Sequence, residues 1–176
     1  EQPPKGRFAS LSGTEAYGCT LAKDGALSCW GRGTTQAPTL THARQVSVAK
    51  PHSCALSVEG ALRCWGNDYE GSLAVPDGVF TQVAVGHSHS CALREVKSIA
   101  CWGWNTSKQC DAPAGEYVFV SSGLQRSCAI DTKGKLECWG DDTIAPDGAF
   151  SQVVIGSGQS CALRSDGEVV CWGYRL

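Results

Sequence analysis

The sequence lacks the features of membrane and nucleic-acid-binding proteins. None of its 176 residues is methionine, and it begins at Glu1, so we expect a mature or trimmed chain from which a signal peptide has been removed. No apolar run approaches the ~18–20 residues that a membrane span needs. The net charge is only −2, with both signs mixed along the chain, so there is no basic patch for nucleic acid. We therefore expect neither membrane insertion nor nucleic-acid binding.

Short catalytic and metal-binding motifs are also missing. The chain has no G-x-S-x-G, no H-E-x-x-H and no phosphate-binding loop of the Walker type. It has eleven cysteines but no C-x2-C pair, which argues against a zinc knuckle and against thioredoxin-like redox chemistry. Long helical periodicity is absent, while glycine is abundant. The sequence therefore predicts an all-β protein that is not an enzyme and holds no metal or cofactor.

A hairpin pattern recurs five times, and it is clearest in residues 52–65, HSCALSVEGALRCW. In each copy two cysteines stand ten positions apart, and Trp-Gly follows the second. The pairs are Cys19/Cys29, Cys54/Cys64, Cys91/Cys101, Cys128/Cys138 and Cys161/Cys171. Cys110 has no place in this scheme. So many cysteines in a short chain indicate an oxidising, extracellular compartment.

The spacing suits a disulfide across each hairpin. If the turn centres on residues 58–60, Leu56 faces Leu62 and the two cysteines oppose each other, with Cα atoms ~4.5–5.5 Å apart. Pairing between neighbouring repeats is the alternative, because spacing alone does not fix connectivity. Four copies place a glycine at the last turn position, where a positive φ is needed. The third copy has Lys97 instead, so its turn is expected to differ.

The full repeat is longer than the hairpin. A short alternating strand precedes each hairpin, as in Phe80–Val85 and Phe150–Ile155, and a Pro-x-Gly-x-aromatic unit introduces several of these strands. The same unit stands at Pro4–Phe8, where no repeat precedes it, while the last repeat stops soon after Gly173. The ends thus complement each other, as a closed ring requires. We predict a single domain over residues 1–176, a closed five-bladed β-propeller whose N-terminus completes the last blade.

Three segments carry a family resemblance. They are residues 65–73, WGNDYEGSL, 83–93, VAVGHSHSCAL, and 152–173, QVVIGSGQSCALRSDGEVVCWG, and they resemble the repeat of the regulator of chromosome condensation family. That resemblance implies a β-propeller, usually of seven blades with longer repeats. Extracellular bacterial relatives include a β-lactamase inhibitor protein, which binds enzymes through loops on one propeller face. The resemblance therefore implies a protein-binding function.

The loops after Trp-Gly differ in every repeat, and equivalent loops of a propeller gather on one face. We predict a ligand-binding face there; the alternative is unconstrained surface loops. Trp104, the only tryptophan outside the repeated position, is a candidate anchor, or else it packs locally. Asn105 begins a possible glycosylation site, Asn-x-Ser. The candidate residues are Tyr69, Trp104, Asn105, Tyr174 and Arg175.

Other residues allow more than one interpretation. The tryptophans of the Trp-Gly pairs are expected to pack between blades; symmetric sugar-binding platforms are the alternative. Just before the cysteines, His52, His87 and His89 suggest a metal site or a pH switch at one end of a central channel, but hydrogen-bonded loop histidines are the simpler interpretation. Cys110 is expected to be a free thiol or to form an intermolecular disulfide.

These patterns together predict a secreted or cell-surface recognition module. Its partner is expected to be an extracellular protein, bound through one propeller face, and inhibition of an extracellular enzyme is one form of this function. The alternative is a lectin that binds a glycan between blades.

Overall fold

The computed structural model describes residues 2–31, 37–141 and 144–173, and over these ranges the chain is built only of β-strands. Each repeat supplies three strands. The first strands are β1 (Phe8–Gly13), β4 (Ala43–Val48), β7 (Phe80–Val85), β10 (Tyr117–Ser122) and β13 (Phe150–Ile155). The second strands are β2 (Tyr17–Ala22), β5 (His52–Ser57), β8 (His89–Arg94), β11 (Arg126–Asp131) and β14 (Gln159–Arg164). The third strands are β3 (Leu27–Gly31), β6 (Leu62–Gly66), β9 (Ile99–Gly103), β12 (Leu136–Gly140) and β15 (Val169–Gly173).

Each repeat folds into its own antiparallel sheet, in which the second strand lies between the first and the third. We number these sheets 1 to 5 along the chain. In sheet 2, Cys54 lies opposite Cys64 and Leu56 opposite Leu62, as the hairpin pattern predicts. The hairpin of every repeat therefore has the register that its cysteine spacing indicates.

All five disulfides join the second and third strands of one sheet. The bonded pairs are Cys19–Cys29, Cys54–Cys64, Cys91–Cys101, Cys128–Cys138 and Cys161–Cys171. This confirms the predicted cross-strand pairing and excludes pairing between neighbouring repeats.

The bonded cysteines lie closer together than the sequence analysis expected, with Cα atoms 4.0–4.1 Å apart. The N–H of Ser57 donates to the carbonyl of Ala61, so these two residues form a hydrogen-bonded pair. Hydrogen-bonded and non-hydrogen-bonded pairs alternate along an antiparallel ladder. Cys54 and Cys64, three pairs further along, are therefore a non-hydrogen-bonded pair. Such pairs are the closer of the two kinds in an antiparallel ladder. The second cysteines of the first four pairs are only half-buried, whereas their partners are fully buried; these second cysteines are Cys29, Cys64, Cys101 and Cys138.

A β-bulge shapes the first strand of every sheet. Strict alternation would place Phe80 and Val83, three residues apart, on opposite faces of β7. The register shifts between Phe80 and Gln82, and the first strands of the other four sheets shift at the equivalent place. The extra residue turns both apolar side chains toward the preceding sheet.

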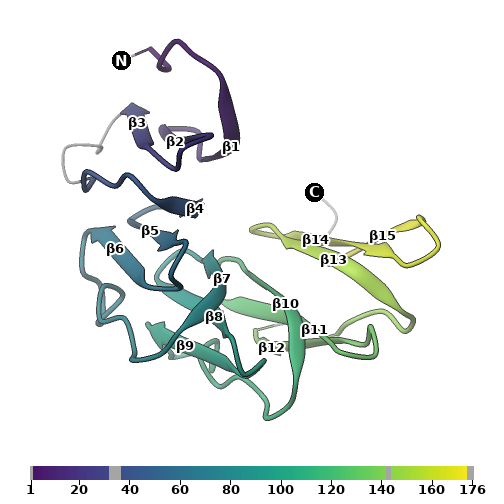
Figure 1. The fold of residues 1–176 in the computed structure, drawn as a ribbon. Coiled ribbons are helices and arrows are strands. Elements are labelled where there is room, and N and C mark those ends of the chain that lie inside the picture. Colours follow the sequence, from purple (N-terminus) through teal and green to yellow (C-terminus); the bar gives the residue numbers. More distant parts are fainter. Residues whose placement is uncertain (1, 32–36, 142–143, 174–176) are drawn as a thin grey trace.

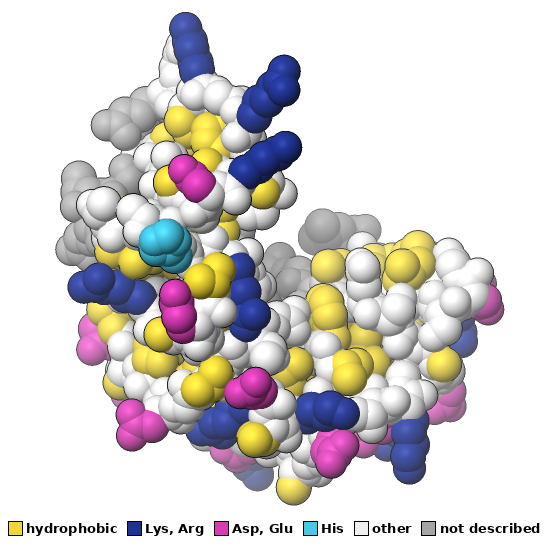
Figure 2. All heavy atoms as spheres, viewed as in Figure 1, with side chains coloured by type: hydrophobic (Ala, Val, Ile, Leu, Met, Phe, Trp, Pro, Cys, Tyr) yellow, Lys and Arg dark blue, Asp and Glu magenta, His cyan; other side chains and the backbone are white. Residues whose placement is uncertain are grey.

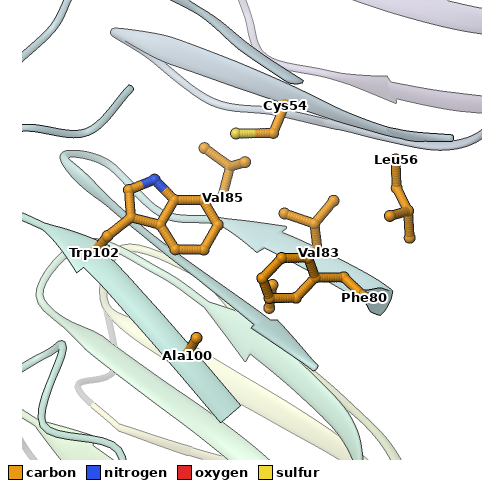
Figure 3. Packing of buried hydrophobic residues seen from close by; sticks show 8 residues of the cluster. Cys54, Leu56, Phe80, Val83, Val85, Ala100 and Trp102 are labelled. Carbon is orange, nitrogen blue, oxygen red and sulfur yellow. The ribbon is translucent and has the colours of Figure 1, made fainter. Parts of the chain in front are cut away.

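Consecutive sheets pack face to face, and the core lies between them. We call the face toward the next sheet the leading face and the face toward the previous sheet the trailing face. Cys54 and Leu56 on the leading face of sheet 2 pack against Phe80, Val83 and Trp102 on the trailing face of sheet 3 (Figure 3). The other three seams bury the equivalent residues.

The five sheets follow one another along an arc (Figure 1). Extensive contacts join consecutive sheets, and across the described residues no such contact joins sheet 5 to sheet 1. In Figure 1 the two end sheets face each other across an open gap. The structure thus has the predicted all-β organisation with one disulfide per sheet, but the predicted closure of the ring is not seen.

The turn at Lys97 corrects one prediction. Lys97 adopts a φ of 64°, close to the positive values of Gly25, Gly60 and Gly134 at the same turn position. Its N–H donates to the carbonyl of Arg94, as the N–H of Gly60 does to its own strand end. The third hairpin therefore keeps the common turn, because the backbone hydrogen bonds of the repeat impose it on a lysine.

Candidate functional site

Two sets of loops lie on the same face of the arc. One set joins the first and second strands (residues 14–16, 49–51, 86–88, 123–125 and 156–158), and the other begins after Trp-Gly. The N–H of Asn67 donates to the carbonyl of Pro51, and that of Trp104 to the carbonyl of Ser88. The corresponding loops of sheet 4 make the same contact. We call this side the loop face; the sequence analysis treated the two sets as separate surfaces.

The loop face brings Tyr69 and Trp104 together. Tyr69 follows β6 and Trp104 follows β9, and their rings meet edge to face with centroids 6.3 Å apart. Tyr69 is 51% exposed and Trp104 is half-buried. Trp104 therefore both packs locally and presents part of its ring beside Tyr69. The pair spans two consecutive sheets, so its geometry depends on the seam between them.

Hydrogen bonds hold both loops in shape. The buried Ser72 hydroxyl accepts the N–H of Tyr69 at 3.1 Å and donates to the carbonyl of Asn67. In the other loop, Asn105 donates from Nδ2 to Asp111 at 2.8 Å, and its Oδ1 accepts a backbone N–H at 2.7 Å. Asn105 therefore positions the Trp104 loop, and its amide nitrogen, the atom that glycosylation would modify, is already engaged.

The remaining predicted residues and one missed residue complete this face. Tyr174 and Arg175 lie outside the described residues. Leu124, which the sequence analysis did not select, is 40% exposed and lines a cavity of about 670 Å³ to which loops of all five sheets contribute. Figure 2 shows the hollow between the two arms of the arc. The signal that could have identified Leu124 is divergence: the equivalent loop positions hold Glu15, Lys50, His87 and Ser157.

The repeated tryptophans belong to the seams. Trp65, Trp102 and Trp139 are buried, and the indole N–H of Trp102 donates to the carbonyl of Ser72 at 3.0 Å. Trp139 makes the equivalent bond to Gln109 at 2.8 Å. These three side chains pack between sheets, as predicted, and their buried rings offer no platform for a sugar.

His52 and His89 are also seam residues rather than lining residues of a channel. Both are fully buried, and Nε2 of each bonds to a serine hydroxyl of the next sheet: His52 to Ser90 at 2.7 Å, and His89 to Ser127 at 2.8 Å. Burial lowers the pKa of both imidazoles to about 4, and neither Nδ1 has a hydrogen-bond partner among the described residues. Both are thus neutral, hydrogen-bonded histidines, whereas His87 is exposed and lines the loop-face cavity.

Cys110 is a half-buried free thiol. Its sulfur lies 3.4 Å from the carbonyl oxygen of Trp104, to which the thiol donates. Burial, with a smaller contribution from Asp111, raises the pKa of this thiol to about 12, so the reactive thiolate is disfavoured. Nothing in this geometry supports the predicted alternative of an intermolecular disulfide.

Across the described residues, no group of three or more histidine, cysteine or acidic side chains is arranged to hold a metal ion. The same part of the chain forms no helix long and apolar enough to cross a bilayer.

The fold and the loop face define a class of protein: an arc of propeller blades that presents divergent loops on one side. The family model of the Regulator of chromosome condensation (RCC1) repeat matches residues 80–109 and 150–174, which fall in sheets 3 and 5. The third and fifth repeats therefore match the RCC1 repeat, the family that the sequence resemblance indicated. No curated protein matches the chain by sequence.

Solved structures show the same architecture. The ectodomain of the Physcomitrella patens receptor kinase CR4 is 23% identical with a TM-score of 0.81, and the alignment covers 94% of this chain and 50% of that one. The CRINKLY WD40 ectodomain of the Arabidopsis thaliana receptor kinase ACR4 is 26% identical with a TM-score of 0.79, covering 94% and 63%. Yeast RCC1 (Prp20), solved with Kap60, is 18% identical with a TM-score of 0.80, covering 96% and 56%. The chain therefore spans between half and two thirds of the length of these structures.

Proposed function

We propose that this chain is an extracellular recognition module that binds a protein partner through its loop face. The observation that carries the proposal is the Tyr69–Trp104 pair, an exposed aromatic contact held between two sheets. Tyrosine and tryptophan are enriched among the residues that dominate protein interfaces. Tyr69 stands three residues after the Trp-Gly pair of its repeat, and Trp104 stands one residue after the Trp-Gly pair of the next repeat. Within the described residues no other two consecutive repeats have aromatic residues at these two places, so the pair marks one asymmetric site.

Rigidity supports this proposal. A disulfide crosses each sheet beneath the loop face, and the Tyr69 and Trp104 loops are tied by hydrogen bonds to Ser72 and Asn105. A surface that is already ordered loses little conformational entropy on binding. Inhibition of an extracellular enzyme would be one form of this function.

The proposed extracellular location rests on two observations. Five disulfides are typical of oxidising compartments. Two of the similar solved structures are receptor ectodomains, and yeast RCC1, a propeller of similar fold, was solved bound to another protein. Closure into a five-bladed ring is not seen across the described residues, and the proposed site does not depend on it because Tyr69 and Trp104 belong to adjoining sheets.

The test compares two exposed side chains on opposite faces. The oxidised protein and the variants Tyr69→Ala and Val96→Ala are immobilised and used to capture proteins from extracellular fluid, and the affinity of each captured protein is then measured. Val96 is 75% exposed in the turn between β8 and β9, at the other end of the strands. We expect a partner that Tyr69→Ala binds at least ~30-fold more weakly, the effect typical of a dominant interface residue, and Val96→Ala binds normally.

Two results would overturn the proposal. One is a partner whose affinity is unchanged by Tyr69→Ala and by Trp104→Ala, which would place its site elsewhere. The other is saccharide binding on a glycan array that is lost in Trp104→Ala, which would make the aromatic pair a sugar-binding site and the chain a lectin.

A further inference from the structure

The two end sheets expose the faces that the inner sheets bury. On the trailing side, Leu11 of sheet 1 is 69% exposed, whereas the equivalent valines of sheets 2 to 5 are 1–6% exposed. On the leading side, Cys161 of sheet 5 is half-buried, whereas its four equivalents are fully buried. Val154 and Val169 beside it are 64% and 62% exposed. Figure 2 shows hydrophobic side chains along the arm that sheet 5 forms.

The leading face of sheet 5 also carries an unused hydrogen-bonding group. Inside the arc, the side-chain amide of Gln45 binds the backbone of the next sheet, donating to the carbonyl of Val83 at 2.9 Å and accepting its N–H at 3.0 Å. Gln82 accepts the N–H of Val120 in the same way at 2.9 Å. Gln152 occupies this position in sheet 5, where it is exposed and has no partner among the described residues.

Sheet 1 offers the backbone that such an amide would bind. Leu11 stands in the register of Val83: it lies opposite Thr20 in β2, as Val83 lies opposite Ala92 in β8. In the seams between sheets, the leading face of one sheet covers a valine, such as Val46 or Val83, on the trailing face of the next. Leu11 is the equivalent apolar residue on the trailing face of sheet 1. One difference weakens the match, because sheet 1 has Gly18 in place of the serine that receives the histidine bond in an inner seam.

We propose that sheet 5 of one molecule docks on sheet 1 of a second copy, extending the inter-sheet seam from chain to chain. Gln152 would bind the backbone at Leu11 of the neighbour, and Val154, Leu163 and Val169 would cover the Leu11 side chain. The argument is continuity: both exposed faces repeat an interface that the chain already forms four times. The contact joins two different faces, so it is heterologous and leaves one free face at each end of the assembly.

The heterologous geometry gives a sharp test by sedimentation velocity. Val154→Asp places a charge on the leading face and Leu11→Asp places one on the trailing face; Val96→Asp is the matched control, since Val96 is similarly exposed but lies in a hairpin turn. We expect the wild type and the control to show a mass that rises with concentration. Each face variant alone should remain a monomer. An equimolar mixture of the two should form dimers and nothing larger, because only one intact pair of faces is available.

Three outcomes would overturn the proposal. The wild type could remain monomeric at every concentration with fast hydrogen exchange around Leu11, which would mean that no second copy covers these faces. It could remain monomeric with slow exchange there, which would mean that the ring closes on itself. The mixture could also fail to dimerise although both variants keep the wild-type melting temperature and circular dichroism. None of these results depends on the Tyr69–Trp104 site.

Discussion

Lys97 shows how strongly the repeat constrains a single residue. Lys97 has a Cβ and a positive φ, a combination that lowers the stability of the folded state by ~1–2 kcal/mol. Glycine would remove this strain, but it would also stabilise the unfolded chain by ~0.4–1 kcal/mol through its greater conformational entropy. We therefore expect Lys97→Gly to raise the free energy of unfolding by about 0.5–1 kcal/mol. Urea denaturation of the oxidised protein measures this. The reverse change, Gly134→Lys, is the control and should lower the free energy of unfolding. If Lys97→Gly did not raise this free energy, or Gly134→Lys did not lower it, turn strain would not decide stability here.

At the scale of the element, the seams make stability depend on pH. His52 and His89 have a pKa of about 4 when folded, against ~6.5 when unfolded, so the unfolded chain binds more protons between these values. Their contribution is complete above about pH 6.5 and is lost as the pH falls toward 4. We expect a loss of about 2 kcal/mol per histidine between about pH 7 and pH 5. Denaturant unfolding at several pH values measures it.

The chain supplies the matched control for that experiment. Gln159 occupies the equivalent position in sheet 5, so glutamine is compatible with this backbone. The double variant His52→Gln/His89→Gln keeps a donor toward Ser90 and Ser127 but cannot be protonated. Its stability should change less than that of the wild type over the same pH range. An equal slope in both proteins would assign the pH dependence to carboxylates elsewhere.

The disulfides should differ in their resistance to reduction. In sheets 1 to 4 the first cysteine of each pair is fully buried in a seam, whereas in sheet 5 Cys171 is exposed and Cys161 half-buried, because no other sheet of the described chain packs on the leading face there. We expect a limiting amount of reductant under native conditions to open Cys161–Cys171 before the others. Alkylation followed by peptide mass spectrometry identifies the reduced pair. Random reduction among the five would mean that access does not control the reaction.

Sequence alone predicts what lies within one repeat. Cysteine spacing gives the register of Cys54 with Cys64, and the recurring glycine locates the hairpin turn. What it does not predict arises between repeats. The contact of Tyr69 with Trp104 joins two different sheets, and the burial of His52 depends on a serine of the next sheet. Neither the open arc nor the shared loop face follows from a repeat taken by itself.

At the scale of the whole molecule, the extensive contacts of each sheet within the described residues are with its neighbours in sequence. Stability is then approximately a sum of terms for single sheets and for the seams between them. Sheets 3 and 4 each have two seams, while sheets 1 and 5 each have one. We expect native-state hydrogen exchange to give higher protection for the amides of β8 and β11 than for those of β2 and β14. Uniform protection would instead indicate one cooperative unit.

The amide of Gln45 has a consequence for how such a chain can evolve. It binds the backbone of Val83, not its side chain, so it accepts any residue that keeps the strand extended. Sheets 2 and 3 thus each recognise the next sheet partly by a feature that nearly every sequence possesses. Copies of the repeat can be duplicated, deleted or exchanged between genes without matching compensatory substitutions, while the loops above them diverge freely toward new partners.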